Sequence, residues 1–212
     1  MRAKIVLLVG VSSVIPFVVL HPSPVSSQPT DKAAKIDHLA LATKYREEQK
    51  WQQARNEYNE IIQTDPNVWR HYISRGFIEL HLKNYVAALD NAQHASALTN
   101  FNGAMGLIAL LRARAYEGMH KTDESIKQYL EATQRMPNNM EAQFELGKIF
   151  YRQKKYDEAY ICLSKAHAQF VDVKKDKRII QLARESETML ENIREKLSSA
   201  KKKNKRKKSD AD

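Results

Sequence analysis

One pattern of small and large residues recurs along this chain, and it constrains the fold more than any other feature. In the segment YDEAYICLSKA, Tyr156 is followed by Ala159 and then by Ala166. Four copies of this spacing begin at Trp51, Tyr85, Thr122 and Tyr156. Matched positions lie 34 residues apart, except between the second and third copies, where the step is 37. Such a period predicts a chain of stacked structural repeats.

A second set of small residues precedes each copy, at Ala42, Gly76, Ala113 and Gly147. Both sets predict helices, so each unit is expected to be an antiparallel helix pair that buries its apolar stripe against its neighbours. The small residues are expected where two helices approach closely, and in the second helices these are Ala54, Ala88, Ser125 and Ala159. Large side chains would fill the spaces between them, namely Tyr45, Tyr58, Tyr116, Tyr129 and Phe150. An aromatic residue before the second helix, as at Trp51, Tyr85 and Tyr156, is expected to pack across the turn.

Composition favours the same fold class. The chain of 212 residues has six glycines and six prolines, too few for a sandwich or barrel rich in tight turns. Its commonest residues are helix formers. The single cysteine, Cys162, cannot form an internal disulfide. The prediction is therefore an all-α protein.

The repeated units resemble the tetratricopeptide repeat (TPR) family. The family motif, Leu-Gly-x-x-Tyr followed by Ala-x-x-x-Phe/Tyr and then Pro, is matched best by Leu146, Gly147 and Phe150, and by Ala54, Tyr58 and Pro66. The sequence departs from it at several places, including Glu79 and Thr122, where the motif has aromatic residues. The resemblance implies a right-handed solenoid of four helix pairs over residues 36–171.

Residues 172–200 have a helical apolar stripe that includes Leu190 and Ile193, and they are predicted to cap the stack. Residues 201–212 have no large apolar residue to fold around and are predicted to be a disordered basic tail. Its basic residues are Lys201, Lys202, Lys203, Lys205, Arg206, Lys207 and Lys208. They would suit an anionic membrane surface or phosphates, or simply solvate the chain. No aromatic residue accompanies them, which disfavours nucleic acid.

The N-terminus has the layout of a secretory signal. Two basic residues precede an uncharged, mostly apolar run at residues 5–20, and a polar stretch ending in small residues follows. The prediction is a signal peptide at residues 1–27, cut before Gln28, with a linker at residues 28–35. The chain would then be exported, as a secreted, periplasmic or secretory-lumen protein. The alternatives are an uncleaved membrane anchor at residues 5–20 and a hydrophobic helix of the fold itself.

Motifs for chemistry are missing from the sequence. It has no Gly-rich phosphate loop, no His-Glu-x-x-His and no paired-cysteine metal motif. The seven histidines have no ligand spacing, and Cys162 is interpreted as a small packing residue. We therefore expect no enzyme activity, no cofactor and no metal.

The TPR resemblance implies that the first helices line a concave groove for a protein or peptide partner. At the family's groove positions the candidate residues here are Arg70, Ile73, Phe77, Leu110, Arg114, Phe144, Lys148 and Tyr151. Such a surface suits a segment with apolar anchors and some acidic groups. In the alternative interpretation, part of this surface packs against neighbouring helices or the mature N-terminal segment. The predicted function is a non-catalytic scaffold or assembly factor, and its alternative is polyanion binding by the tail. The sequence does not indicate an oligomeric state.

Overall fold

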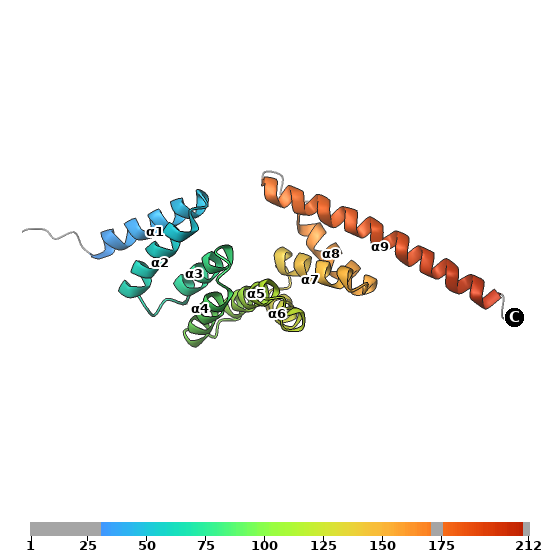
Figure 1. The fold of residues 1–212 in the computed structure, drawn as a ribbon, viewed down its shortest axis with the longest axis horizontal. Helices are drawn as coiled ribbons and strands as arrows, with labels where there is room; N and C mark the ends of the chain where they lie inside the picture. The colour runs from blue at the N-terminus through green and yellow to red at the C-terminus, as the bar shows by residue number, and fades with distance from the viewer. Residues whose placement is uncertain (1–30, 171–175, 210–212) are drawn as a thin grey trace, which may run out of the picture.

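A computed structural model describes residues 31–170 and 176–209, and these residues form helices without a strand among them (Figure 1). The predicted signal peptide, residues 1–27, lies outside this part of the chain. The helices are α1 (Asp31–Glu47), α2 (Trp51–Thr64), α3 (Trp69–His81), α4 (Tyr85–Ala97), α5 (Asn102–Gly118), α6 (Thr122–Arg135), α7 (Met140–Arg152), α8 (Tyr156–Phe170) and α9 (Lys177–Ser209).

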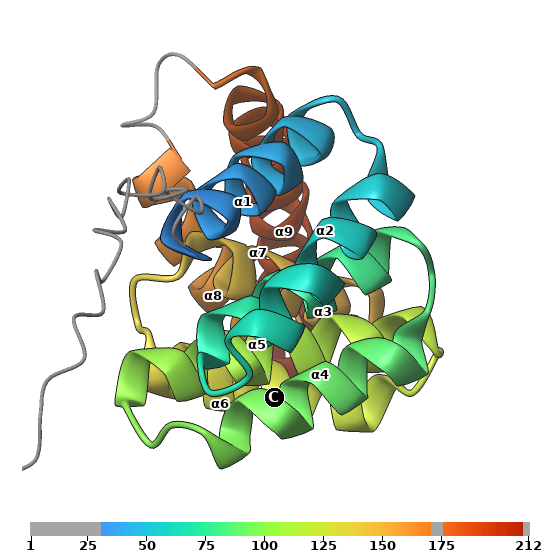
Figure 2. The ribbon, with the colours of Figure 1, turned by 90° about the vertical axis from the view of Figure 1, so that its left-hand side faces the viewer.

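The first eight helices form hairpins that stack in chain order. The pairs are α1 with α2, α3 with α4, α5 with α6 and α7 with α8, and each hairpin also contacts the next one. Figures 1 and 2 show this succession from two directions, with α9 beside α7 and α8. The predicted all-α helical solenoid is confirmed.

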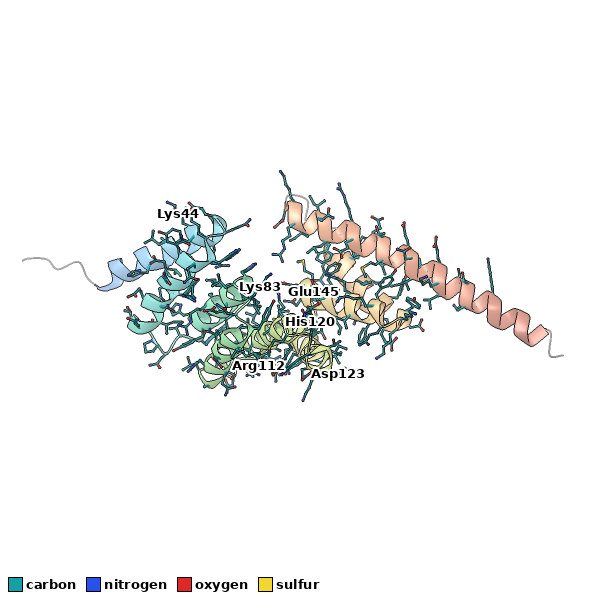
Figure 3. The ribbon with its side chains drawn as sticks, in the orientation of Figure 1. Lys44, Lys83, Arg112, His120, Asp123 and Glu145 are labelled. Carbon is teal, nitrogen blue, oxygen red and sulfur yellow. The ribbon has the colours of Figure 1, made fainter. Side chains whose placement is uncertain are left out.

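The turns inside the hairpins repeat one conformation. A residue with positive φ ends the turn region in each, at Gln49, Lys83, His120 and Lys154, with φ between 57° and 61° (Figure 3 labels Lys83 and His120). The next residue donates its backbone N–H to a carbonyl five residues back, as Lys155 does to Phe150 at 3.0 Å. The four residues with positive φ recur along the chain at the same spacing as the sequence repeat.

The small residues lie in the seams between helices, as predicted. Ala42, Ala113 and all four matched positions of the second helices are 0% exposed. A Cβ atom added to Gly76 would stand 2.4 Å from Leu111 Cδ2, and one added to Gly147 would stand 2.7 Å from Leu163 Cγ. The helices can approach this closely only because these positions lack larger side chains.

Helix α9 covers the last hairpin, which agrees with the predicted cap. Ile193 and Leu190 are buried in one apolar cluster with Phe170 of α8. On the polar side of this contact, the Ser186 hydroxyl lies 2.8 Å from His167 Nδ1. The helix begins at Lys177 rather than near residue 172, because the Asp176 carboxylate accepts hydrogen bonds from the first free backbone N–H groups.

Two predicted boundaries need correction. Helix α9 continues to Ser209, so residues 201–209 are helical rather than disordered. Lysine and arginine are good helix formers, and no glycine or proline interrupts residues 177–209. Helix α1 begins at Asp31, inside the predicted linker at residues 28–35, because the segment DKAAK also lacks a helix breaker.

None of the helices described here combines the length and the apolar composition that crossing a membrane requires. The apolar run at residues 5–20, the alternative membrane anchor, is outside the described residues.

Candidate interaction surface

A cleft of about 710 Å³ opens between the end of α1, the end of α3 and the start of α9. Helix α1 contributes Thr43 and Arg46, α3 contributes Phe77 and His81, and α9 contributes Arg178. Figure 1 shows the start of α9 on the same side of the stack as α1, with α3, α5 and α7 between them. The cleft therefore lies on the inner side of the curved stack and joins its two ends.

Guanidinium groups dominate the charge of this cleft. Arg114 of α5 donates to the Glu141 carboxylate at 2.9 Å, and Arg178 approaches the same carboxylate oxygen at 3.9 Å. Arg46 is exposed on α1. Glu47 also lines the cleft, so its lining residues bring two guanidinium groups, Arg46 and Arg178, and one carboxylate. This balance favours an anionic group on a ligand.

An aromatic wall stands beside these charges. The rings of Trp51 and His81 stack with their centroids 3.8 Å apart and their planes 1° from parallel. Burial lowers the pKa of His81, and the nearby Arg114, Arg178 and Arg46 lower it further. The lowered pKa favours the neutral ring, so the stacked pair offers a flat apolar surface rather than another charge.

Phe77 links the cleft with the core. It lines the cleft, and it also packs against the two apolar clusters on either side of it. The guanidinium carbon of Arg114 lies 5.9 Å from the centre of its ring. Phe77 is thus a predicted groove residue that lines this cleft, and Arg114 lies beside its ring.

Three of the predicted apolar anchors lie in the core instead. Ile73 is 6% exposed, Leu110 is 2% exposed and Phe144 is 1% exposed. Phe144 packs edge-to-face against Phe170, with ring centroids 5.5 Å apart. The expectation that these side chains face a partner is corrected, because neighbouring helices already cover them. This agrees with the interpretation that part of the surface packs internally.

The remaining predicted groove residues are engaged locally. Arg70 lies over the ring of its neighbour Trp69, 4.5 Å from the centroid. Lys148 pairs with Glu145 at 3.1 Å, and Tyr151 packs against Tyr156. The predicted basic tail residues lie on the last turns of α9, where Lys201 and Lys202 are exposed.

The described residues contain no group of three or more histidine, cysteine, aspartate or glutamate side chains able to hold a metal. Cys162 is buried, and this burial raises the pKa of its thiol, so the reactive thiolate is disfavoured. The packing role predicted for Cys162 agrees with this position.

Sequence reasoning missed the contributions of Trp51, His81 and Arg178 to the cleft. Trp51 was expected to pack across its own turn; it packs against an apolar cluster that includes Ala42 of its own hairpin, and its ring also stacks on His81 of the next one. Trp51 matches Tyr85 and His81 matches Gly118 in the repeat, so the repeat pattern could have indicated a contact between these two places. Arg178 had no such signal, because its place depends on how α9 folds back on the stack.

The sequence matches the model of the tetratricopeptide repeat over residues 39–101 and 110–166, and each stretch takes in residues of two hairpins. Among solved structures, a crystal structure of MamA has 15% identity and a TM-score of 0.55, and the match covers 84% of this chain and 96% of that one. The first TPR domain of human RPAP3 has 25% identity and a TM-score of 0.51, with coverage of 57% and 93%. The TPR domain of Arabidopsis OM64 has 20% identity and a TM-score of 0.50, with coverage of 55% and 94%. No curated protein matches the sequence.

Proposed function

Because this chain belongs to the tetratricopeptide repeat family, we propose that it is a non-catalytic module that binds a segment of a protein partner in the cleft between α1, α3 and α9. Members of this family typically mediate interactions between proteins or their assembly. The observation that carries the proposal is the cleft itself, where Arg46 and Arg178 from the two ends of the stack face Phe77 at its middle.

The chemistry of the cleft indicates the kind of segment that fits. Phe77 and the stacked pair of Trp51 and His81 suit an apolar or aromatic anchor. Arg46 and Arg178 suit an acidic side chain beside that anchor, through charge-assisted hydrogen bonds. We therefore propose a partner segment that combines apolar and acidic residues, in an extended or a helical conformation.

The experiment uses the exposed Thr43 as an attachment point for a photocrosslinking residue, because it lines the cleft without a core contact. After the crosslinked partner is identified, its affinity is compared for Arg46→Glu and for Lys127→Glu. Lys127 is exposed on α6, so its variant makes the same charge change away from the cleft.

Arg46→Glu should weaken binding about tenfold at low salt, and high salt should reduce this difference. Lys127→Glu should bind like the parent. Equal losses in both variants would indicate an unspecific charge effect and contradict the cleft proposal. Loss of binding only on truncation after Ala200 would favour the polyanion alternative instead.

We also propose that the chain is exported, on the basis of the charged, apolar and small-residue order of residues 1–27. The mature protein should then begin near Gln28 and lie outside the cytoplasm. Mass spectrometry of the N-terminus after cell fractionation tests this, and an intact Met1 on cytosolic protein would contradict it. An intact N-terminus in the membrane fraction would favour an anchor at residues 5–20.

A further inference from the structure

The residue that opens the second helix of a hairpin fills a repeated place in this stack. In the first hairpin Trp51 stacks on His81, the last residue of α3. In the second hairpin Tyr85 lies against Gly118, the last residue of α5, where an added Cβ atom would stand 2.2 Å from the tyrosine ring. The same place between successive hairpins is thus filled twice by an aromatic ring.

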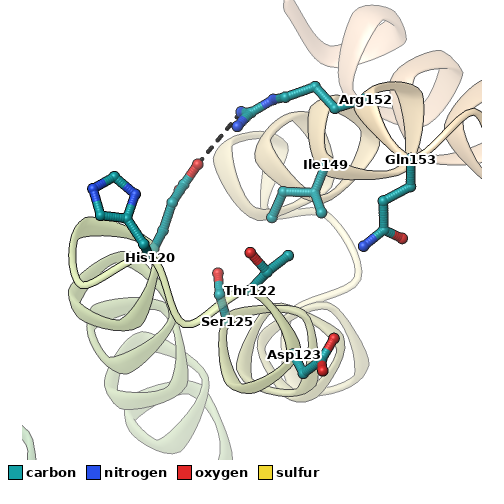
Figure 4. A pocket seen from close by; sticks show the side chains of 8 residues that line it. His120, Thr122, Asp123, Ser125, Ile149, Arg152 and Gln153 are labelled. Atoms are coloured by element: carbon teal, nitrogen blue, oxygen red, sulfur yellow. Dashed lines mark hydrogen bonds and ion pairs between the residues drawn. The ribbon is translucent and has the colours of Figure 1, made fainter.

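The third hairpin breaks this rule. Thr122 opens α6, and the matching residue at the end of α7 is Arg152. A pocket of about 420 Å³ remains there, lined by both residues and by Ser125 and Ile149 (Figure 4). The pocket therefore lies where the ring of a tryptophan or tyrosine would stand if the repeat were regular.

The pocket holds polar groups suited to a ring with a hydrogen-bond donor. The Ser125 hydroxyl oxygen is buried and has no hydrogen-bond partner. Arg152 makes a long ion pair with Glu117, at 3.5 Å, across the space (Figure 4), and its side chain is 60% exposed. Arg152 ends α7 as His81 ends α3, and a planar guanidinium is able to lie flat on an aromatic ring.

We propose that this pocket accepts a tryptophan or tyrosine side chain of a partner protein, which replaces the aromatic residue missing at position 122. The ring would stack on Arg152, and its N–H or O–H would donate to the Ser125 hydroxyl. Phe101 is the exposed aromatic side chain among the described residues, and its ring has no donor for the Ser125 hydroxyl, which favours a partner protein over a second copy. The pocket is separate from the cleft, and its occupant adds a second point of contact.

Indole is the probe, and its binding is monitored in ¹H–¹⁵N spectra of the labelled protein. Indole should shift the amide signals of Thr122, Ser125 and Ile149 and bind with a dissociation constant on the order of 1 mM, as a small fragment does. N-methylindole, which has the ring but no donor, should bind severalfold more weakly.

The blocking variant is Thr122→Tyr, which restores the ring found at Tyr85 and Tyr156. Its ring should fill the pocket, raise the melting temperature by about 2–4 °C and abolish the indole shifts. Lys127→Tyr adds the same side chain to an exposed site of α6 outside this pocket, and it should leave the indole shifts intact.

The proposal is overturned if indole leaves these signals unmoved in the parent, which can be tested even if Thr122→Tyr does not fold. It is also overturned if the shifts persist in a folded Thr122→Tyr variant, or if N-methylindole binds as well as indole. Self-association of the parent that is lost on Phe101→Ala and competes with indole would assign the pocket to a second copy and overturn the partner assignment.

Discussion

The seams between the helices and the cleft on the inner side of the stack are built in different ways. In the seams, each unit supplies an equivalent small residue, such as Gly76 in α3 and Gly147 in α7. In the cleft, Arg46 and His81 are residue types that the matched positions of the other units do not repeat, and Arg178 lies in α9, outside the units. Residues that recur in every unit specify the fold, whereas residues that occur once give the stack its particular binding surface.

The largest expected effect comes from breaking a seam. Gly147→Leu should lower the free energy of unfolding by roughly 1–3 kcal/mol, because its Cβ atom alone would approach Leu163 Cγ within 2.7 Å. Chemical denaturation measures this change. The control is Glu158→Leu, at an exposed position of α8. If Gly147→Leu and Glu158→Leu both unfold at the same denaturant concentration as the parent, the claim that α7 packs closely against α8 at Gly147 is wrong.

A smaller and opposite effect is expected at the turns. Lys154 has a φ of 59°, a conformation that costs a residue with a Cβ atom more than it costs glycine. Lys154→Gly should therefore stabilise the protein by about 0.5–1 kcal/mol, after the greater flexibility of glycine in the unfolded chain is included. Lys155→Gly, one residue later and without a positive φ, should give no such gain. A thermal melt of both variants distinguishes the two results.

How much of this molecule could be predicted depends on repetition. The seams were predictable because Ala54 and Ala88, like Gly76 and Gly147, recur at matched positions, and small residues mark close helix contacts. The four turns follow the same register. The end of α9 was misjudged because a lack of apolar residues was taken to mean disorder, although lysine and arginine sustain a helix.

The binding surface was less predictable. Leu110 and Phe144 were assigned to it from the family's groove positions, which do not reveal how tightly this stack closes over them. His81 and Trp51 were not assigned to it, because their contact joins two hairpins. Arg178 depends on where α9 begins, which the Asp176 carboxylate determines locally but the repeat pattern does not.

The smallest effect is a pH dependence in the cleft. The pKa of His81 lies below its ordinary value of 6.5 in the folded chain, so the unfolded chain takes up the proton first as pH falls. Neutral His81 therefore supports stability above about pH 6.5, and this support is lost as pH falls through its folded pKa. His81→Phe keeps a ring against Trp51 without the titration. Between about pH 7.5 and about pH 5.5, the melting temperature of this variant should fall less than that of the parent. Equal falls would show that His81 does not carry the effect.

The central claim is that partner binding uses the unrepeated surface at the cleft rather than the basic end of α9. Hydrogen–deuterium exchange of the full chain, with and without the partner identified from Thr43, tests this claim directly. We expect added protection at the end of α1, at the end of α3 around Phe77 and His81, and at the start of α9 around Arg178, with residues 198–209 unchanged. Protection confined to residues 198–209, with the cleft exchanging as in the free protein, would contradict the claim.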